Sequence, residues 1–217
     1  MNRLGVFGKL PAHGDFIDRN LSGEFIQVWD EWMQCILSGS KERLGDGWLD
    51  YYLTSRIWRF ALKPGVVDGQ SWFGVVVPSV DSVGRYFPLT MTVPVEGNLN
   101  TNNVISDNDD WFSALEALAI SALNSQYAVD EILNNSSDIH IVLRDSPVKI
   151  HKAINGSINI YGGSFADQVM MVGAESMDSL GAYSIWMASG EDKQGSCTLI
   201  KTGLPSPDDY VDMICGN

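Results

Sequence analysis

The stretch FGVVV, residues 73–77, is continuously apolar, and three of its five residues are β-branched valines. A strand of this composition is typical of a sheet that other elements cover on both faces. The stretch therefore predicts a central strand, around which the remaining strands and helices have to be placed.

Two further strands are predicted on either side of this stretch in the sequence. Residues 57–62 alternate apolar side chains on one face with Arg59 on the other, as strand spacing requires. Residues 86–95 contain Pro88 and Pro94, which cannot donate to a β-ladder. This strand is therefore expected either at a sheet edge or bounded by the two prolines. Other short apolar runs predict strands at residues 4–10, 139–143, 157–161, 183–187 and 197–201.

Helix signals lie between the predicted strands. Ser22 is a suitable N-cap for a helix whose apolar residues recur at helical spacing, and Gly39 is a suitable residue to end it. A second long helix is expected from about Asp109, because acidic residues favour a helix N-terminus. Near the end of the chain, Ser206 followed by Pro207 predicts a last helix with Ser206 as its N-cap.

The interleaving of strands and helices favours an α/β architecture. We expect a single domain over residues 1–217, with a mixed sheet covered by helices on both faces as a three-layer sandwich. The opening strand and the strand at 73–77 should share this sheet. Residues 97–107 are polar and rich in turn formers, so they are expected to cross the surface without dividing two cores.

The acidic composition argues against two classes of partner. The chain has 27 Asp and Glu residues against 14 Lys and Arg, which gives a formal net charge of −13. Such a surface repels nucleic-acid phosphates and anionic lipids, so we expect neither nucleic-acid binding nor membrane insertion. The charge serves either solubility or contact with a basic patch on a protein partner.

The cysteines and the N-terminus predict the cellular location. Cys35, Cys197 and Cys215 form no CxxC pair and leave an odd residue, which favours reduced thiols in the cytoplasm. The first residues contain no apolar run of signal-peptide length, and no stretch approaches the ~20 apolar residues that span a bilayer. We therefore expect a cytoplasmic protein.

A search for catalytic and ligand-binding patterns identifies no reaction. The segment GVFGKL, residues 5–10, has too short a spacing for a phosphate-binding loop and lacks the hydroxyl after its lysine. No GxSxG sequence is present. His13 and Asp15 could ligate a metal, but Asp15 could also accept backbone hydrogen bonds in its own turn. We expect no catalytic residue, no cofactor and no metal site.

The sequence also predicts an ionic cluster around two charged residues. Asp15 and Arg85 each follow a glycine and adjoin bulky apolar residues, where charges are normally paired. We therefore expect a buried or half-buried ionic cluster of Asp15 and Arg85, with Arg56 or Arg59 as further members. The cluster is either structural or part of a partner-binding surface. The rival interpretation is a hydrolase cleft formed by His13, Asp15 and Arg85.

Three segments together resemble motifs of one family. They are GKLPAHGDFIDR at residues 8–19, PSVDSVGRYFPLT at 78–90 and GLPSPDDYVDMI at 203–214, and they resemble TagF, the type VI secretion-associated proteins. The resemblance runs over nearly the full chain, although residues 98–181 are less diagnostic. The matching residues, as candidates for an interaction surface or a structural cluster, are Gly8, Lys9, Pro11, Gly14, Asp15, Phe16, Trp58, Arg59, Ser79, Asp81, Gly84, Arg85, Tyr86, Pro88, Trp186, Pro205 and Ser206.

The resemblance implies a function that the residues alone do not. It implies a cytoplasmic accessory or regulatory protein of bacterial type VI secretion, without an enzymatic mechanism. It further implies a post-translational repressor that binds secretion components, with the forkhead-associated scaffold protein as the expected partner. The alternatives are the hydrolase described above and a structural subunit of the secretion apparatus.

Overall fold

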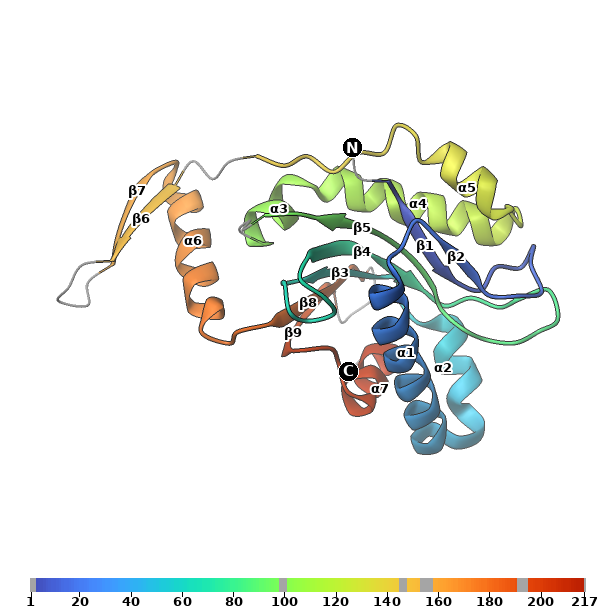
Figure 1. The fold of residues 1–217 in the computed structure, drawn as a ribbon. Helices are drawn as coiled ribbons and strands as arrows, with labels where there is room; N and C mark the ends of the chain where they lie inside the picture. The colour runs from blue at the N-terminus through green and yellow to red at the C-terminus, as the bar shows by residue number, and fades with distance from the viewer. Residues whose placement is uncertain (1–2, 98–100, 145–147, 153–157, 191–194, 217) are drawn as a thin grey trace.

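The computed structural model describes residues 3–97, 101–144, 148–152, 158–190 and 195–216. Seven strands form one sheet (Figure 1): β1 (Gly5–Gly8), β2 (Ile17–Arg19), β3 (Trp58–Leu62), β4 (Ser71–Val77), β5 (Leu89–Val95), β8 (Tyr183–Ala188) and β9 (Cys197–Thr202). Their order across the sheet is β2-β1-β5-β4-β3-β8-β9. The strands β6 (Val148–Lys152) and β7 (Ile158–Gly162) form a separate two-stranded sheet that projects from one end of the molecule.

The strand pairs of the described residues are all antiparallel, whereas the sequence analysis expected a mixed sheet. The connections β3–β4, β4–β5 and β8–β9 join neighbouring strands directly, without the crossover helix that parallel neighbours need. The helices that precede β8 lie instead in the connections β2–β3 and β5–β8, which join strands that are not neighbours, and the last helix follows β9.

The strand β4 occupies the middle of the sheet, as the stretch FGVVV predicted, and all of its residues are buried. Its side chains alternate between two hydrophobic clusters. Phe73 and Val75 belong to the first cluster, and Trp72 and Val76 belong to the second. The strand is apolar throughout because both of its faces are covered. The predicted opening strand, β1, lies in the same sheet.

The strand β5 is interior, so the prediction of an edge position for it is wrong. It begins directly after Pro88, as the alternative interpretation required. Pro94 is tolerated inside the strand because β1 pairs with β5 only as far as Thr92. Beyond Thr92, β5 has no β1 partner, so the absent N–H of Pro94 removes no hydrogen bond between these two strands.

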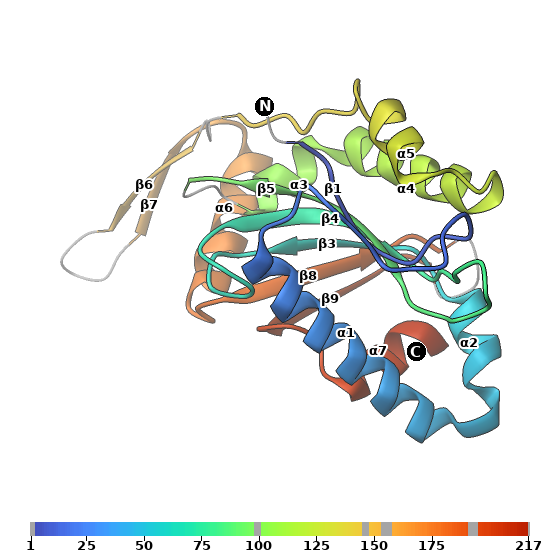
Figure 2. The same ribbon diagram turned by 45° about the vertical axis from the view of Figure 1, so that its right-hand side comes forward.

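Helices cover both faces of the sheet, which confirms the predicted three layers (Figure 2). One face carries α1 (Gly23–Leu44), α2 (Trp48–Thr54) and α7 (Pro207–Cys215), with a 3-10 turn at Gly45–Gly47 between the first two. The other face carries α3 (Thr101–Asp107), α4 (Asp109–Asn124) and α5 (Val129–Asn135), and α6 (Phe165–Asp178) packs against α3 and the β6–β7 hairpin. The first cluster is buried under α4, and the second, rich in tryptophan, under α1 and α7.

The two predicted N-caps are confirmed, whereas the prediction that Gly39 ends the first helix is wrong. The Ser22 side chain accepts a hydrogen bond from the backbone of Phe25, and Ser206 forms a capping box with Asp209, as predicted. Gly39 lies inside α1, five residues before its end. A Cβ atom at Gly39 would lie 2.5 Å from Cβ of Pro207, so the glycine permits close packing of α1 on α7 and does not end the helix.

Two further predictions of local structure are wrong. Residues 139–143 do not form a strand, because the amide side chain of Asn108 bonds to both backbone groups of Val142, at 2.6 and 2.8 Å, in place of a ladder partner. Part of the expected surface linker at 97–107 is the helix α3, in which Val104 is buried in the first cluster; residues 98–100 of that linker lie outside the described residues.

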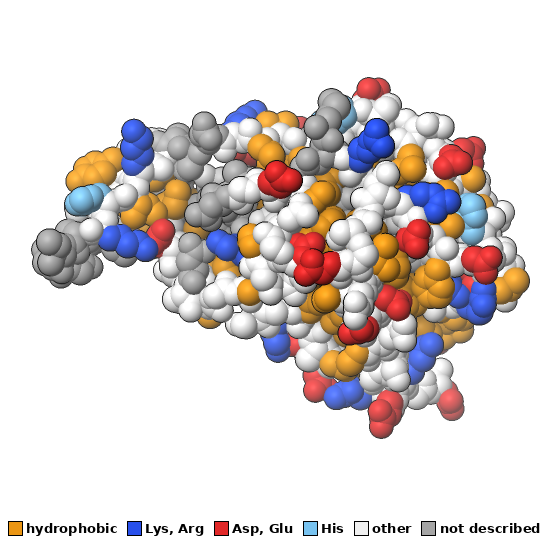
Figure 3. Space-filling view, in the orientation of Figure 1, with side chains coloured by type: hydrophobic (Ala, Val, Ile, Leu, Met, Phe, Trp, Pro, Cys, Tyr) orange, Lys and Arg blue, Asp and Glu red, His pale blue; other side chains and the backbone are white. Residues whose placement is uncertain are grey.

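The surface carries its charges unevenly. Figure 3 shows mainly basic side chains at the end formed by the β6–β7 hairpin, whereas the body of the molecule carries both acidic and basic side chains. Within the described ranges, no helix is both long enough and apolar enough to cross a membrane.

Candidate functional site

Two loops that carry the sequence motifs meet at the end of the sheet away from the β6–β7 hairpin (Figure 1). The first motif loop, residues 9–16, leaves β1, and the second motif loop, residues 78–88, enters β5. They meet because β1 and β5 are antiparallel neighbours, with Phe7 opposite Thr90. Gly8 makes the junction possible: its φ is +123°, and a Cβ atom there would lie 2.0 Å from the carbonyl oxygen of Pro88.

A buried ion pair joins the two motif loops. Nζ of Lys9 lies 2.6 Å from Oδ2 of Asp81, and both side chains are almost completely buried. Nε of Arg85 donates to the same oxygen at 2.7 Å, while its terminal nitrogen donates to the carbonyl of Gly14 in the first loop. Arg85 itself remains largely exposed. One buried carboxylate thus holds two cations and fixes one loop against the other.

Asp81 also shapes the second motif loop. Its Oδ1 accepts backbone hydrogen bonds from Val83 at 3.1 Å and from Arg85 at 2.8 Å. Burial raises the pKa of the Asp81 carboxyl, but the hydrogen bonds from Lys9 and Arg85 outweigh burial and hold this pKa well below its usual range. The carboxylate therefore stays charged and bonded in the folded protein.

Ser79 and Tyr52 form the base beneath this ion pair. The hydroxyl of Ser79 donates to the carbonyl of Lys9 at 2.7 Å, and the hydroxyl of Tyr52 donates to the carbonyl of Ser79 at 2.9 Å. Burial raises the pKa of Tyr52, so its hydroxyl stays protonated. The sequence analysis missed Tyr52, because its position in a short helix indicated only an inward-facing aromatic residue and not the partner of its hydroxyl.

An aromatic side chain covers the ion pair from outside. The ring of Phe16 is half exposed, contacts Phe87 edge-on at 4.7 Å between centroids, and lies 4.9 Å from Nζ of Lys9. Val83, at the tip of the second loop, is 68% exposed. Asp15, Phe16, Val83 and Arg85 therefore form an exposed surface of mixed apolar and charged character, here named the motif surface. Figure 3 shows hydrophobic, acidic and basic side chains close together at this end.

The prediction that Arg85 pairs with Asp15 is wrong, because the carboxylate that binds Arg85 belongs to another residue. Asp15 is exposed, and Arg85 bonds to Asp81 instead. Neither of the other arginines joins the cluster: Arg56 donates to the carbonyl of Gly195, and Arg59 lies on the opposite face of the sheet from the second cluster. The carboxylate that binds Arg85 is that of Asp81, in the loop between β4 and β5. The pairing of β1 with β5 brings this loop beside the first motif loop.

Arg59 instead ties β3 to α4. Its guanidinium donates to both carboxylate oxygens of Glu116, at 2.7 and 2.8 Å, and to Asp109 at 2.5 Å. The hydrogen bond to Glu116 raises the pKa of Arg59, although its partial burial lowers it. This residue is structural and lies apart from the motif surface.

The groups of the proposed hydrolase cleft have separate partners. Nε2 of His13 accepts the backbone N–H of Val129, at the start of α5, at 3.2 Å. Asp15 is exposed and Arg85 is bound to Asp81. In the contacts of the described residues, these three side chains do not form the mutually hydrogen-bonded set that general acid–base or nucleophilic catalysis uses.

The remaining motif residues divide into two groups. Pro11, Gly14, Gly84, Tyr86 and Pro88 lie in the two motif loops, together with Lys9, Phe16, Ser79 and Asp81, and Gly8 ends β1 directly before the first loop. The others lie under α1 and α7: Trp58 is buried in the second cluster, Nε1 of Trp186 donates to Ser184, and the carbonyl of Pro205 accepts from Trp32. The second group supports packing and does not reach the motif surface.

Comparisons with known proteins agree with the placement of the motifs. The family model of the TagF N-terminal domain, described as type VI secretion system-associated, matches residues 5–139, which include both motif loops. The crystal structure of PA0076 from Pseudomonas aeruginosa PAO1 is similar over 99% of this chain and 94% of that chain, with a TM-score of 0.84 and 30% sequence identity. No curated protein matches the sequence.

Proposed function

Because the chain belongs to the TagF family of type VI secretion-associated proteins, we propose that it represses assembly of the secretion system by binding another of its components. The expected partner is the forkhead-associated scaffold protein, and the expected place of action is the cytoplasm. Repression is post-translational and needs no catalysis. The observation that carries the proposal is the motif surface, in which exposed side chains rest on a buried ion pair.

The motif surface has the properties of a protein contact. A few large side chains usually supply most of the binding energy of an interface, and Phe16 and Arg85 are of the types that do so. Both are held by the rigid base of the two loops, Phe16 against Phe87 and Arg85 against Asp81. A surface that is already ordered loses less conformational entropy on binding, so more of the contact energy appears as affinity.

The net charge of −13 favours a partner with a basic contact region. An acidic body accelerates encounter with such a partner, and salt screens this attraction. We therefore expect the association rate with the scaffold protein to fall as ionic strength rises, while the dissociation rate changes less.

Effector secretion tests the repressor role. Deletion of the gene should increase secretion of an effector into the medium, and overexpression should decrease it. Loss of secretion on deletion would identify a structural subunit instead. Turnover of a phosphoester or peptide substrate by the purified protein, abolished by His13→Ala, would support the hydrolase.

A pull-down of the forkhead-associated scaffold protein tests the motif surface. Val83→Glu adds a charge to an exposed apolar side chain of this surface and should abolish capture while leaving the fold intact. The control is Ile120→Glu, because Ile120 is also an exposed apolar residue and lies on α4, outside the motif surface. Equal capture by the two variants would place the contact elsewhere.

A further inference from the structure

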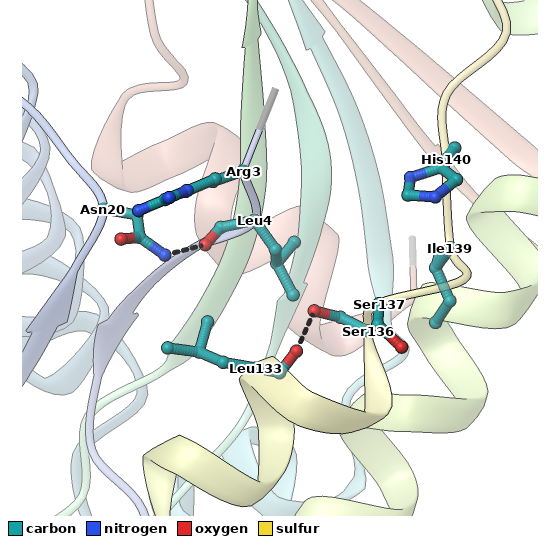
Figure 4. A pocket seen from close by; sticks show the side chains of 8 residues that line it. All are labelled: Arg3, Leu4, Asn20, Leu133, Ser136, Ser137, Ile139 and His140. Atoms are coloured by element: carbon teal, nitrogen blue, oxygen red, sulfur yellow. Dashed lines mark hydrogen bonds between the residues drawn. The ribbon is translucent and has the colours of Figure 1, made fainter. Parts of the chain in front are cut away.

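A pocket of about 600 Å³ lies at the opposite end of β1 from the motif loops (Figure 4). Its walls come from three segments: Arg3 and Leu4 before β1, Asn20 after β2, and residues 133–140 at the end of α5. The established family assignment and the proposed contact at the motif surface do not use it. This volume is within the range of small-molecule sites in proteins.

The floor of the pocket is apolar. Leu4 is buried in the first hydrophobic cluster, and Leu133 and Ile139 pack against that cluster from the end of α5. Because these three side chains are held by the core, they present a preformed hydrophobic surface. An apolar group of a ligand would be removed from water against them.

The polar atoms of the walls favour an anion. Arg3 and His140 line the pocket from its two sides, as Figure 4 shows, and no Asp or Glu is among the lining residues. No carboxylate of the described residues forms an ion pair with Arg3. The chain as a whole is acidic, with 27 Asp and Glu residues. The residues that line this pocket include an arginine and a histidine but no acidic residue, so its charge differs from that of the rest of the surface.

Two other polar side chains of the pocket are already engaged. The amide of Asn20, whose φ of +56° is left-handed, donates to the carbonyl of Leu4 at 2.9 Å. The hydroxyl of Ser136 donates to the carbonyl of Leu133 at 2.8 Å. These bonds occupy the carbonyls of Leu4 and Leu133, and the guanidinium of Arg3 remains as a charged donor for a ligand.

We propose that this pocket binds a monocarboxylate whose apolar part rests on Leu4, Leu133 and Ile139. The planar guanidinium of Arg3 matches a carboxylate geometrically and forms charge-assisted hydrogen bonds with it. His140 lines the opposite side of the pocket. The net charge of −13 disfavours ligands of higher negative charge, which limits the site to a single anionic group. The carboxylate belongs either to a free small acid or to the C-terminus of a peptide.

Titration of the ¹⁵N-labelled full chain with 4-phenylbutyrate tests this proposal, with 4-phenylbutyramide as the neutral matched probe. We expect chemical-shift changes at the amides of Leu4, Leu133 and Ile139, and binding of the amide probe weaker by about tenfold or more. Acetyl-Leu-Leu with a free C-terminus, compared with its amidated form, distinguishes the two sources. Tighter binding of this peptide acid than of phenylbutyrate would assign the site to chain termini.

A pair of arginine variants gives the decisive comparison. Arg3→Gln should weaken phenylbutyrate binding about tenfold, while Arg19→Gln, an exposed arginine outside the pocket lining, should leave it unchanged. Both variants should retain the remaining resonances of the folded chain. Absence of shifts at the pocket up to the solubility limit, equal binding of acid and amide, or unchanged binding by Arg3→Gln would each overturn the proposal. None of these outcomes bears on repression, which the secretion assay tests separately.

Discussion

The ammonium of Lys9 is buried between the two motif loops, and Oδ2 of Asp81 lies 2.6 Å from it. Lys9→Ala should lower the free energy of unfolding by about 3 kcal/mol, because it leaves a buried carboxylate with one of its two cationic partners removed. For a chain of this size, the melting temperature should fall by about 6 °C or more. Thermal unfolding followed by circular dichroism provides the measurement.

Asp15→Ala is the control for this substitution. Asp15 belongs to the same loop but is exposed, so its removal should change stability by no more than about 0.5 kcal/mol. The sequence analysis placed Asp15 in a buried or half-buried ionic cluster with Arg85, and in such a cluster its removal would cost much more. Equal effects of the two substitutions would contradict the assignment of the buried pair to Lys9 and Asp81.

The depressed pKa of Asp81 predicts how stability changes in acid. A carboxyl whose folded-state pKa is lowered contributes stability that is present above its unfolded pKa and is lost as pH falls toward the folded value. The unfolded pKa is about 3.9, so the loss should begin near about pH 4 and continue below it. Asp81→Asn removes this titration, and urea unfolding of the variant should show a smaller decrease in stability between about pH 4 and pH 2 than the native chain.

Among the secondary-structure elements, the contact of α1 with α7 depends on the absence of a side chain at Gly39. Gly39→Ala would place a Cβ atom 2.5 Å from Cβ of Pro207, which belongs to a rigid ring. We expect a loss of about 1–3 kcal/mol from overpacking, although alanine favours a helix interior by up to about 1 kcal/mol. Urea unfolding of the variant measures the balance of the two effects.

Gly23→Ala is the matched substitution in the same helix. A Cβ atom at Gly23 meets no atom within 4 Å, so this variant should be as stable as the native chain or slightly more so. A stabilising effect at both positions would show that α7 adjusts to the added methyl group, and that α1 and α7 are packed less closely than the distance indicates.

At the scale of the whole molecule, we propose that residues 1–217 form one domain. The two hydrophobic clusters lie on opposite faces of one sheet, and β4 contributes side chains to both. The strand β8 continues that sheet beside β3, and it supplies Tyr183 to the first cluster and Trp186 to the second. Neither cluster is complete without residues from the last third of the chain.

A fragment that ends at residue 139, where the family match ends, tests the one-domain proposal. It lacks β8, β9 and α7, and therefore exposes β3 and the aromatic cluster under α1. We expect this fragment to show no cooperative thermal transition. The full chain should unfold in a single transition, whose midpoints measured by circular dichroism and by tryptophan fluorescence coincide. Cooperative unfolding of the fragment would reveal an independent folding unit.

Features that depend on a few neighbouring residues could be predicted from the sequence. The apolar run of β4, the N-caps at Ser22 and Ser206, and the alternation around Arg59 each act within one strand or one helical turn, and the structure contains all of them. The TagF motifs are local strings as well, so the family could be identified before the fold was known, and the family match agrees with it.

Only the tertiary structure decided which distant residues meet. The partner of Arg85, the interior position of β5 and the role of Gly39 all depend on pairings between segments far apart in the chain, such as β1 with β5 and α1 with α7. Asp15 and Asp81 present the same carboxyl chemistry, and both lie in turns of the motif loops, so their local sequence does not show which of them is buried. Burial is a property of the whole packed chain, because the free energy of an ion pair is set by the groups that surround it and exclude water.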